Sequence, residues 1–331
     1  MLFLLFIGCA LGQNNNNANA TISSMLVSRP RSMSVEFWTS ERMRAATEPK
    51  MSVPMKNMPL DRSLPIINGP PISVSSIDPD RTSLISRVLN ANGRQVATTG
   101  RVFWACDNTG YSSCSASVIS SNSSDLIVTA AHCVFDTTTL RWLINCNWIF
   151  VPAYSNGNAP YGRWPARETA ALTAWTRSKP DYNYDVAFVA LSPVNGRHIV
   201  QVTGSQSLGF NQPRSQTTYA FGYPVNIGNG QTLQSCSGIP AASQYTLNGY
   251  KGQGLSNCGM GGGCSGGPWL QQFNTATGPD NSAIPFYDRV FCGDVEGLAI
   301  FRSVEIDLVQ LGGSAKCETT EMHTSPIQSP Q

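Results

Sequence analysis

The amino-acid sequence predicts an all-β fold. The chain of 331 residues contains 29 Gly and 21 Pro, which interrupt a series of short apolar runs. Gly, Asn and Pro between such runs are typical of the turns that connect strands. Only 13% of the residues are charged, about half the usual share for a soluble domain. Roughly 240 residues of this pattern are compatible with one β enzyme built as two packed barrels.

The expected strands are apolar runs of four to six residues, each bounded by turn residues. They are Ala116–Ile119, Leu126–Ala131, Trp148–Val151, Val186–Leu191, Thr218–Tyr223 and Gly297–Phe301. The run that starts at Leu126 is rich in apolar and β-prone residues, so we expect it to end in the protein core.

The first eleven residues form an apolar run that is too short to span a bilayer. Ala10 and Gly12 are small residues at the spacing of a signal-peptide cleavage site, so we expect residues 1–12 to be a signal peptide and the protein to be secreted. Cys9 leaves a lipid anchor open as an alternative. The later chain contains no candidate membrane span, and we expect no stable membrane insertion.

Residues 13–75 differ in composition from the rest of the chain. They hold six of the nine Met and no Cys, begin with an Asn-rich run and end in a Pro-rich one. Such a stretch lacks the spaced apolar residues of a packed core, so we expect a loosely ordered pro-segment. A disordered tail without a role is the alternative. Residues 76–317 would form the enzyme domain and residues 318–331 a flexible tail.

Ten Cys in an exported chain indicate disulfides rather than metal thiolates, and the sequence contains no C-x-x-C pair. We therefore expect neither a metal nor a cofactor. Nine Cys follow the signal peptide, so at least one thiol is left over or pairs between chains. Net charge is +2 without a basic block, which excludes a nucleic-acid footprint. Asn19 and Asn122 stand in glycosylation sequons.

The stretch Gly259–Pro268 is the main candidate for chemistry. Five of its first eight residues are Gly, and Ser265 supplies its hydroxyl. Taken alone, the stretch could be an ordinary flexible loop. It also suits a serine nucleophile surrounded by backbone N–H donors, provided that the chain supplies a base and a carboxylate.

His132 and Asp185 are the candidates for that base and that carboxylate. His132 follows directly on the buried run that starts at Leu126, and histidine suits proton transfer near neutral pH. Asp185 opens the apolar run to Leu191, where a carboxylate needs N–H donors; Asp181 lies in a turn and is the poorer candidate. The other two histidines, His198 and His323, fit structural or surface positions.

Three blocks of the sequence together resemble the chymotrypsin-type (trypsin-like) serine proteases, in that family's chain order. The blocks are Thr129–Cys133, Asp185–Leu191 and Gly263–Pro268. The resemblance implies two packed six-stranded antiparallel β-barrels with the active site in the cleft between them. It implies that His132 is the general base, that Asp185 orients it and that Ser265 is the nucleophile. Backbone N–H groups of Gly263 and Ser265 would form the oxyanion hole.

Further blocks resemble the secreted microbial glutamyl-endopeptidase-like branch of the family. These blocks are Asp80–Thr82, Phe150–Tyr154, Pro160–Gly162, Gly222–Pro224 and Ser265–Trp269. The resemblance also implies two disulfides, Cys114–Cys133 and Cys236–Cys258. It does not pair Cys106, Cys146, Cys292 or Cys317.

The chain departs from the pancreatic-type enzymes in one place. Those enzymes carry Asp before the nucleophile, which forms an ion pair with the new N-terminus, whereas this chain has Cys264. Gly259 stands where a trypsin-like preference would need Asp, and the wall after Ser265 lacks a His for Glu preference. We therefore expect an apolar or mixed preference at the cleaved bond.

The sequence thus predicts a secreted serine endopeptidase that acts through an acyl-enzyme. Its partners would be protein or peptide substrates and proteinaceous inhibitors, and we expect a monomer. The alternative is a catalytically silent protease-like binding or adhesion protein. An α/β-hydrolase esterase matches the spelling G-x-S-x-G around Ser265 but requires the chain order Ser–Asp–His, which this sequence contradicts.

Overall fold

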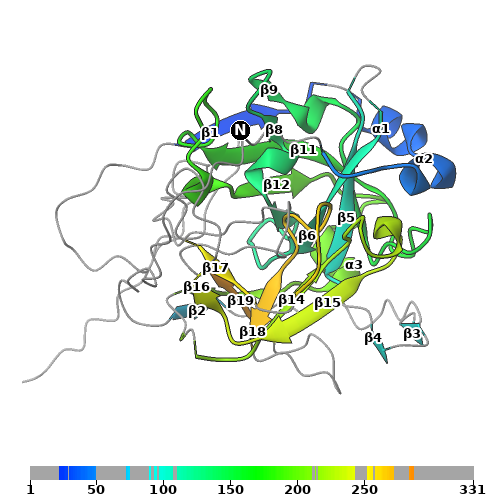
Figure 1. Ribbon diagram of the computed structural model, residues 1–331. Coiled ribbons are helices and arrows are strands. Elements are labelled where there is room, and N and C mark those ends of the chain that lie inside the picture. The colour runs from blue at the N-terminus through cyan, green and yellow to red at the C-terminus, as the bar shows by residue number, and fades with distance from the viewer. Residues whose placement is uncertain are drawn as a thin grey trace, which may run out of the picture.

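The computed structural model contains a closed six-stranded antiparallel barrel (Figure 1). Its strands, in order around the barrel, are β5 (Thr99–Trp104), β6 (Ser112–Val118), β7 (Leu126–Thr129), β12 (Ala187–Leu191), β11 (Trp164–Leu172) and β10 (Ile149–Pro152). Pairing of β11 with β12 on one side and β10 on the other closes it. Four of the runs that the sequence indicated as strands supply β6, β7, β10 and β12.

The structure describes residues 22–28, 30–49, 72–74, 89–90, 93–94, 97–106, 110–210, 213, 215–242, 252–255, 258–271 and 283–286. The predicted signal peptide, Asn19, the block Asp80–Thr82, the run Gly297–Phe301, His323 and residues 318–331 lie outside these residues. So do Cys292 and Cys317.

A second sheet of six strands lies below the barrel in Figure 1. Its order is β15 (Gln234–Gly238), β14 (Thr218–Gly222), β18 (Trp269–Gln271), β19 (Ala283–Phe286), β13 (Ser207–Phe210) and β2 (Ile72–Val74). This sheet differs from the expected second antiparallel barrel. The β13–β19 pair is parallel, and within the described residues the sheet runs from β15 to β2 without closing. Parallel strands cannot be joined by a tight hairpin. The long connection between β13 and β19 permits their parallel pairing.

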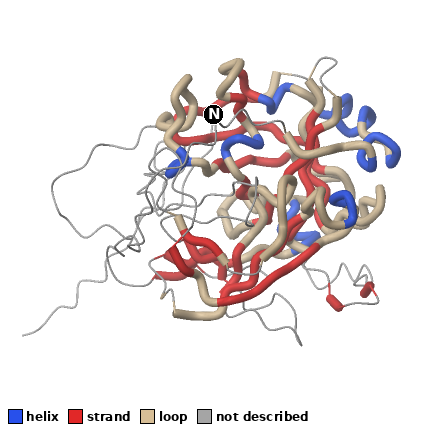
Figure 2. Tube along the Cα trace, viewed as in Figure 1, coloured by secondary structure: helices blue, strands red, loops and turns tan. Residues whose placement is uncertain are grey.

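The remaining elements are short (Figure 2). The small two-stranded pairs are β3 (Leu89–Asn90) with β4 (Gly93–Arg94), β8 (Phe135–Asp136) with β9 (Arg141–Trp142), and β16 (Ala241–Ala242) with β17 (Gln253–Gly254). The α-helix α3 (Ile199–Thr203) lies between β12 and β13 in the chain. The 3₁₀ turns are η1 (Ala131–Cys133), η2 (Leu143–Asn145), η3 (Tyr182–Tyr184) and η4 (Gly228–Gly230). Within the described residues, none of the helices has the length and apolar character needed to cross a membrane.

The N-terminal segment is described over residues 22–28 and 30–49. It forms β1 (Ile22–Leu26), α1 (Arg31–Phe37) and α2 (Ser40–Arg44), and β1 pairs antiparallel with β11. Figure 1 shows α1 and α2 packed against the barrel beside β5. The side chains of Trp38 and Met43 in this segment are fully buried against the barrel.

A buried arginine ties this N-terminal segment to the barrel. Arg101 on β5 is fully buried, and its Nη2 donates to the carbonyl of Ala46 at 2.8 Å and to Oγ of Ser113 at 2.7 Å. The guanidinium lies over the rings of Phe103 and Tyr154, at 5.0 and 5.3 Å from their centroids. Removal from water lowers the pKa of Arg101. The cation is thus held by the carbonyl of Ala46 in the N-terminal segment and by hydroxyl and aromatic groups elsewhere in the chain.

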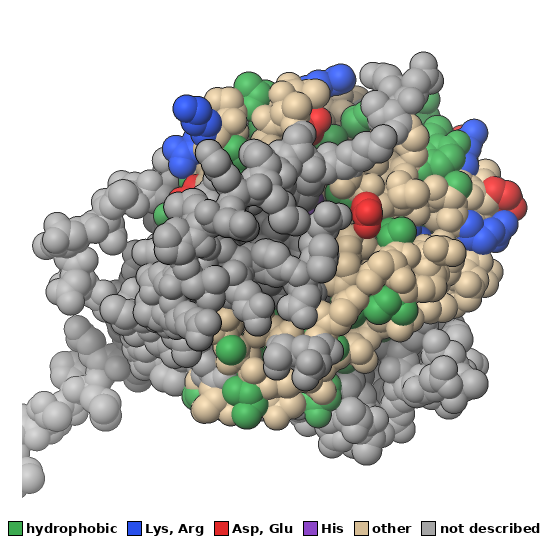
Figure 3. Space-filling model, viewed as in Figure 1, with side chains coloured by type: hydrophobic (Ala, Val, Ile, Leu, Met, Phe, Trp, Pro, Cys, Tyr) green, Lys and Arg blue, Asp and Glu red, His purple; other side chains and the backbone are tan. Residues whose placement is uncertain are grey.

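Among the described residues on the face drawn in Figure 3, charged side chains lie apart from one another, toward the upper, left and right margins and with an acidic side chain near the centre. Uncharged polar and backbone atoms cover much of the described surface there. This agrees with the low charged fraction of the sequence, 13%.

Candidate active site

His132 and Asp185 are brought together by the pairing of two barrel strands. Ala187 of β12 lies opposite Thr129 of β7, so the turn that follows β7 meets the segment that precedes β12. His132 lies in that turn, η1, and Asp185 lies between η3 and β12. The barrel register therefore places these two side chains at one edge.

The carboxylate of Asp185 binds His132 through both oxygens. Oδ1 accepts from the backbone N–H of His132 at 2.8 Å, and Oδ2 lies 2.6 Å from Nδ1 of the ring. Asp185 is fully buried and His132 is 6% exposed, so each satisfies the other in a site with little water. Because a carboxylate oxygen only accepts, Nδ1 carries the hydrogen and the lone pair of Nε2 is left available. Among the described residues, Nε2 has no hydrogen-bond partner.

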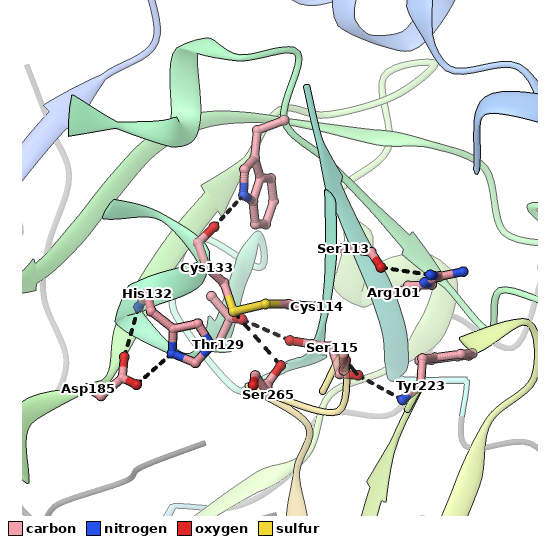
Figure 4. The surroundings of a disulfide bond; sticks show 12 residues. Arg101, Ser113, Cys114, Ser115, Thr129, His132, Cys133, Asp185, Tyr223 and Ser265 are labelled. Carbon is pink, nitrogen blue, oxygen red and sulfur yellow. Dashed lines mark hydrogen bonds and ion pairs between the residues drawn. A yellow bond between two sulfur atoms is a disulfide. The ribbon is translucent and has the colours of Figure 1, made fainter. Parts of the chain in front are cut away.

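Ser265 lies beside this pair, and in Figure 4 the His132 ring lies between Asp185 and Ser265. The Ser265 carbonyl accepts from the N–H of Ser115 on β6 at 2.8 Å, and Sγ of Cys133 lies 4.0 Å from the same oxygen. Ser265 is 2% exposed. Bonds between a hydroxyl and its base are often long in unliganded enzymes and shorten when substrate binds. A ring nitrogen with an available lone pair beside a serine can take the hydroxyl proton.

Backbone hydrogen bonds orient the loop around Ser265. The Gly262 carbonyl accepts from Val225 N at 2.7 Å, and the Cys264 carbonyl accepts from Gly267 N at 3.0 Å. In a trans peptide the N–H points away from the C=O, so these bonds fix the directions of the N–H groups of Gly263 and Ser265. Within the described chain, neither N–H donates to a backbone carbonyl. Both groups are thus available to an anion.

Two glycines of this loop have a backbone conformation that residues with a side chain disfavour. Gly263 has φ +91° and Gly266 has φ +81°, in the left-handed region that side chains disfavour. A Cβ on Gly266 would also collide with Oγ1 of Thr129 and the carbonyl of Ser115. The Gly-rich composition therefore reflects close packing of the loop against β6 and β7.

A cavity of about 630 Å³ opens beside His132, a size usual for ligand pockets. Its walls include Trp175 and Tyr182 near the histidine and Thr47 and Glu48 from the N-terminal segment. The His132 and Trp175 ring centroids are 6.3 Å apart.

Three disulfides are present in the described chain. Cys114–Cys133 and Cys236–Cys258 are the two predicted pairs, and Cys106–Cys146 is a pair that the sequence left open. Cys114–Cys133 joins β6 to the turn that carries His132. Sγ of Cys114, Sγ of Cys133 and a ring nitrogen of His132 lie within 4.8 Å of one another, but the disulfide uses both sulfurs and removes them as metal ligands. Cys264 is buried and is in none of these disulfides.

The other sequence candidates have structural positions. His198 caps the N-terminus of α3, and its Nδ1 lies 2.8 Å from Oδ2 of Asp125. Asp181 caps η3 by accepting from Asn183 N. Asn122 is exposed in a turn, as a glycosylation acceptor requires. Ser115 was not predicted from the sequence, although its position next to Cys114 is a usable signal.

Comparisons with known proteins agree with this geometry. The family model of the trypsin-like peptidase domain matches residues 114–278. The crystal structure of protease Anisep from Arthrobacter nicotinovorans is 30% identical, with a TM-score of 0.53; the match covers 65% of this chain and 93% of that one. The chain belongs to the trypsin-like serine protease family. A thermostable serine protease, AL20, from an extremophilic microorganism is 31% identical with a TM-score of 0.51, over 62% of this chain and 90% of that one. No curated protein matches the chain.

Membership of the trypsin-like family confirms the all-β, chymotrypsin-like fold. It also implies that the substrates are peptides. The contact of His132 with Asp185 lies at the edge of the closed barrel.

Proposed function

We propose that this protein is a serine endopeptidase in which His132, Asp185 and Ser265 form the catalytic triad. The single observation that carries the proposal is the two-point bond from His132 to Asp185, which leaves Nε2 as an acceptor. Ser265 Oγ attacks the carbonyl carbon of the scissile bond while Nε2 takes the hydroxyl proton. Nε2 then gives the proton to the leaving amine, and water hydrolyses the acyl-enzyme by the same route in reverse.

The N–H groups of Gly263 and Ser265 form the oxyanion hole in this proposal. The negative oxygen of the tetrahedral intermediate would accept from both. Their directions are set before substrate arrives, by the bonds to the Gly262 and Cys264 carbonyls. Donors fixed in advance cost no reorganisation in the transition state, and loss of one such donor costs about 10²–10³ in kcat in related chemistry.

A fluorophosphonate probe tests the triad directly. We expect one adduct, at Ser265, when the purified protein is labelled and its peptides are mapped. Labelling should vanish in Ser265→Ala and fall strongly in His132→Ala, because the hydroxyl then lacks its base. Ser117→Ala, which removes another fully buried serine hydroxyl, is the matched control and should label normally. Folded wild-type protein that takes no label would favour the silent binding protein instead.

We also propose that the protein is secreted and that residues 13–75 are a pro-segment. The three disulfides support an oxidising compartment. Residues 22–49 pack on the barrel, and Thr47 and Glu48 line the cavity beside His132. Cleavage near residue 75 would thus leave the piece bound beside the site. The blocks quoted above support a place in the glutamyl-endopeptidase-like branch.

Processing can be read from protein collected from the culture medium. We expect a single peak in size-exclusion chromatography that contains two associated chains, one of which starts close to residue 76. The N-terminal piece should remain bound because Trp38 is buried against the barrel. Intact mass before and after glycosidase treatment reports use of Asn122 and Asn19. A single chain that still begins at residue 13 would argue against the pro-segment.

A further inference from the structure

Ser115 makes two hydrogen bonds to the nucleophile loop, Gly259–Pro268. It lies on β6, next to Cys114, and is fully buried. Its N–H donates to the Ser265 carbonyl at 2.8 Å, and its own carbonyl accepts from Oγ1 of Thr129 at 2.8 Å. Its hydroxyl donates to the Gly263 carbonyl at 2.9 Å and accepts from Tyr223 N at 2.9 Å. Figure 4 shows Ser115 between Ser265 and Tyr223.

Three consecutive peptide groups of this loop, those with the carbonyls of Gly262, Gly263 and Cys264, are fixed by hydrogen bonds. The Ser115 hydroxyl binds the carbonyl of the middle one. The carbonyls of Gly262 and Cys264 are held by backbone N–H groups, which a substitution leaves in place. The carbonyl of Gly263 is held by the side chain of Ser115. This middle peptide connects the two N–H groups proposed for the oxyanion hole. Its orientation sets ψ of Gly263 and φ of Cys264, and therefore the separation and angle of those two donors.

We propose that Ser115 is a positioning residue for the oxyanion hole. The inference rests on the proposed function, since Ser115 acts through the loop on the N–H groups of Gly263 and Ser265. Its hydroxyl fixes a Gly-rich loop that has little stiffness of its own, because glycine adopts many backbone conformations. The N–H of Tyr223 donates to the Ser115 hydroxyl and orients it. The position of the loop therefore depends on both β6 and the segment that follows β14.

Ser115→Ala should lower kcat by about 10- to 100-fold with KM within twofold of the wild type. Without the hydroxyl, the Gly263 carbonyl and the Tyr223 N–H lose their partners, and the loop can turn to satisfy them. A displaced donor stabilises the transition state less while leaving ground-state binding unchanged. The effect is expected to be smaller than removal of a donor, because both N–H groups remain.

The matched control is Ser117→Ala. Ser117 lies two residues further along β6, is also fully buried, and its hydroxyl donates to the Thr98 carbonyl away from the loop. We would measure kcat and KM, the rate constant of fluorophosphonate labelling and the melting temperature for both variants. Rates are compared well below each melting temperature, so that loss of folded protein does not count as loss of kcat.

The outcomes separate the two proposals. Wild-type protein that labels at Ser265, with Ser115→Ala slower than Ser117→Ala in both kcat and labelling, supports the positioning role. Equal rates for the two variants overturn that role and leave the triad intact. Unlabelled wild-type protein overturns the proposed function itself. If Ser115→Ala does not fold, Ser115→Thr and Ser115→Val provide a second pair of similar shape, in which only Thr keeps a hydroxyl; equal kcat in that pair also overturns the role.

Discussion

Asp185→Asn should lower kcat by about 10⁴-fold while the fold stays intact. Asparagine has nearly the same shape as aspartate, but one oxygen becomes an NH₂ donor. An NH₂ group facing Nδ1 favours the histidine tautomer with the hydrogen on Nε2, and that nitrogen can then no longer accept the serine proton. The buried contact of 2.6 Å between Nδ1 and Oδ2 leaves the ring little freedom to turn away. The measurement is kcat on a peptide substrate, with circular dichroism to verify folding.

Asp181→Asn is the control for this substitution. Asp181 lies four residues earlier and caps η3, accepting from Asn183 at 2.9 Å without touching His132. We expect its kcat to stay close to the wild-type value. A loss of less than tenfold in Asp185→Asn would mean that Asp185 does not set the tautomer of His132.

Trp38→Ala should reduce the free energy of unfolding by about 3–5 kcal/mol, as for other large-to-small changes at buried aromatic positions. The Trp38 side chain is fully buried between the N-terminal helices and the barrel, with its ring edge-on to Phe37 and Tyr111. Its Nε1 donates to the Asn147 carbonyl, so truncation leaves a cavity and removes this buried hydrogen bond. Denaturant unfolding of the full chain measures the change.

Met33→Ala is the matched control, because Met33 lies in α1 but is 52% exposed. We expect its effect to stay within about 0.5 kcal/mol, as for most surface substitutions. If Trp38→Ala were no more destabilising than Met33→Ala, the N-terminal segment would not be part of the cooperative fold.

The candidate site residues could be predicted from the sequence alone. His132, Asp185 and Ser265 stand in local frames that can be recognised without a structure: an apolar run before the histidine, an apolar run after the aspartate, and a Gly-rich loop around the serine. Each frame is a property of a few neighbouring residues, so the fold class and the candidate residues could be predicted. The pairs Cys114–Cys133 and Cys236–Cys258 followed from the resemblance to a family and not from the spacing.

Other features depend on contacts between distant segments. The side chains of Trp38 and Met43 are buried because the barrel offers a surface for them, which the composition of residues 13–75 did not indicate. The pair Cys106–Cys146 forms because β5 and the turn after η2 meet, and the parallel β13–β19 pair follows from the path of the chain.

The loop that contains Cys264 shows both what the sequence determines and what depends on the tertiary structure. The sequence by itself determined the fold class, the three candidate residues and the lack of a carboxylate before Ser265. Only the tertiary structure decided what orders the nucleophile loop: backbone bonds from Val225 and Gly267, and the hydroxyl of Ser115. The physical reason is that local patterns report the preferences of adjacent residues, whereas a hydrogen bond across 148 positions exists only after the barrel has closed.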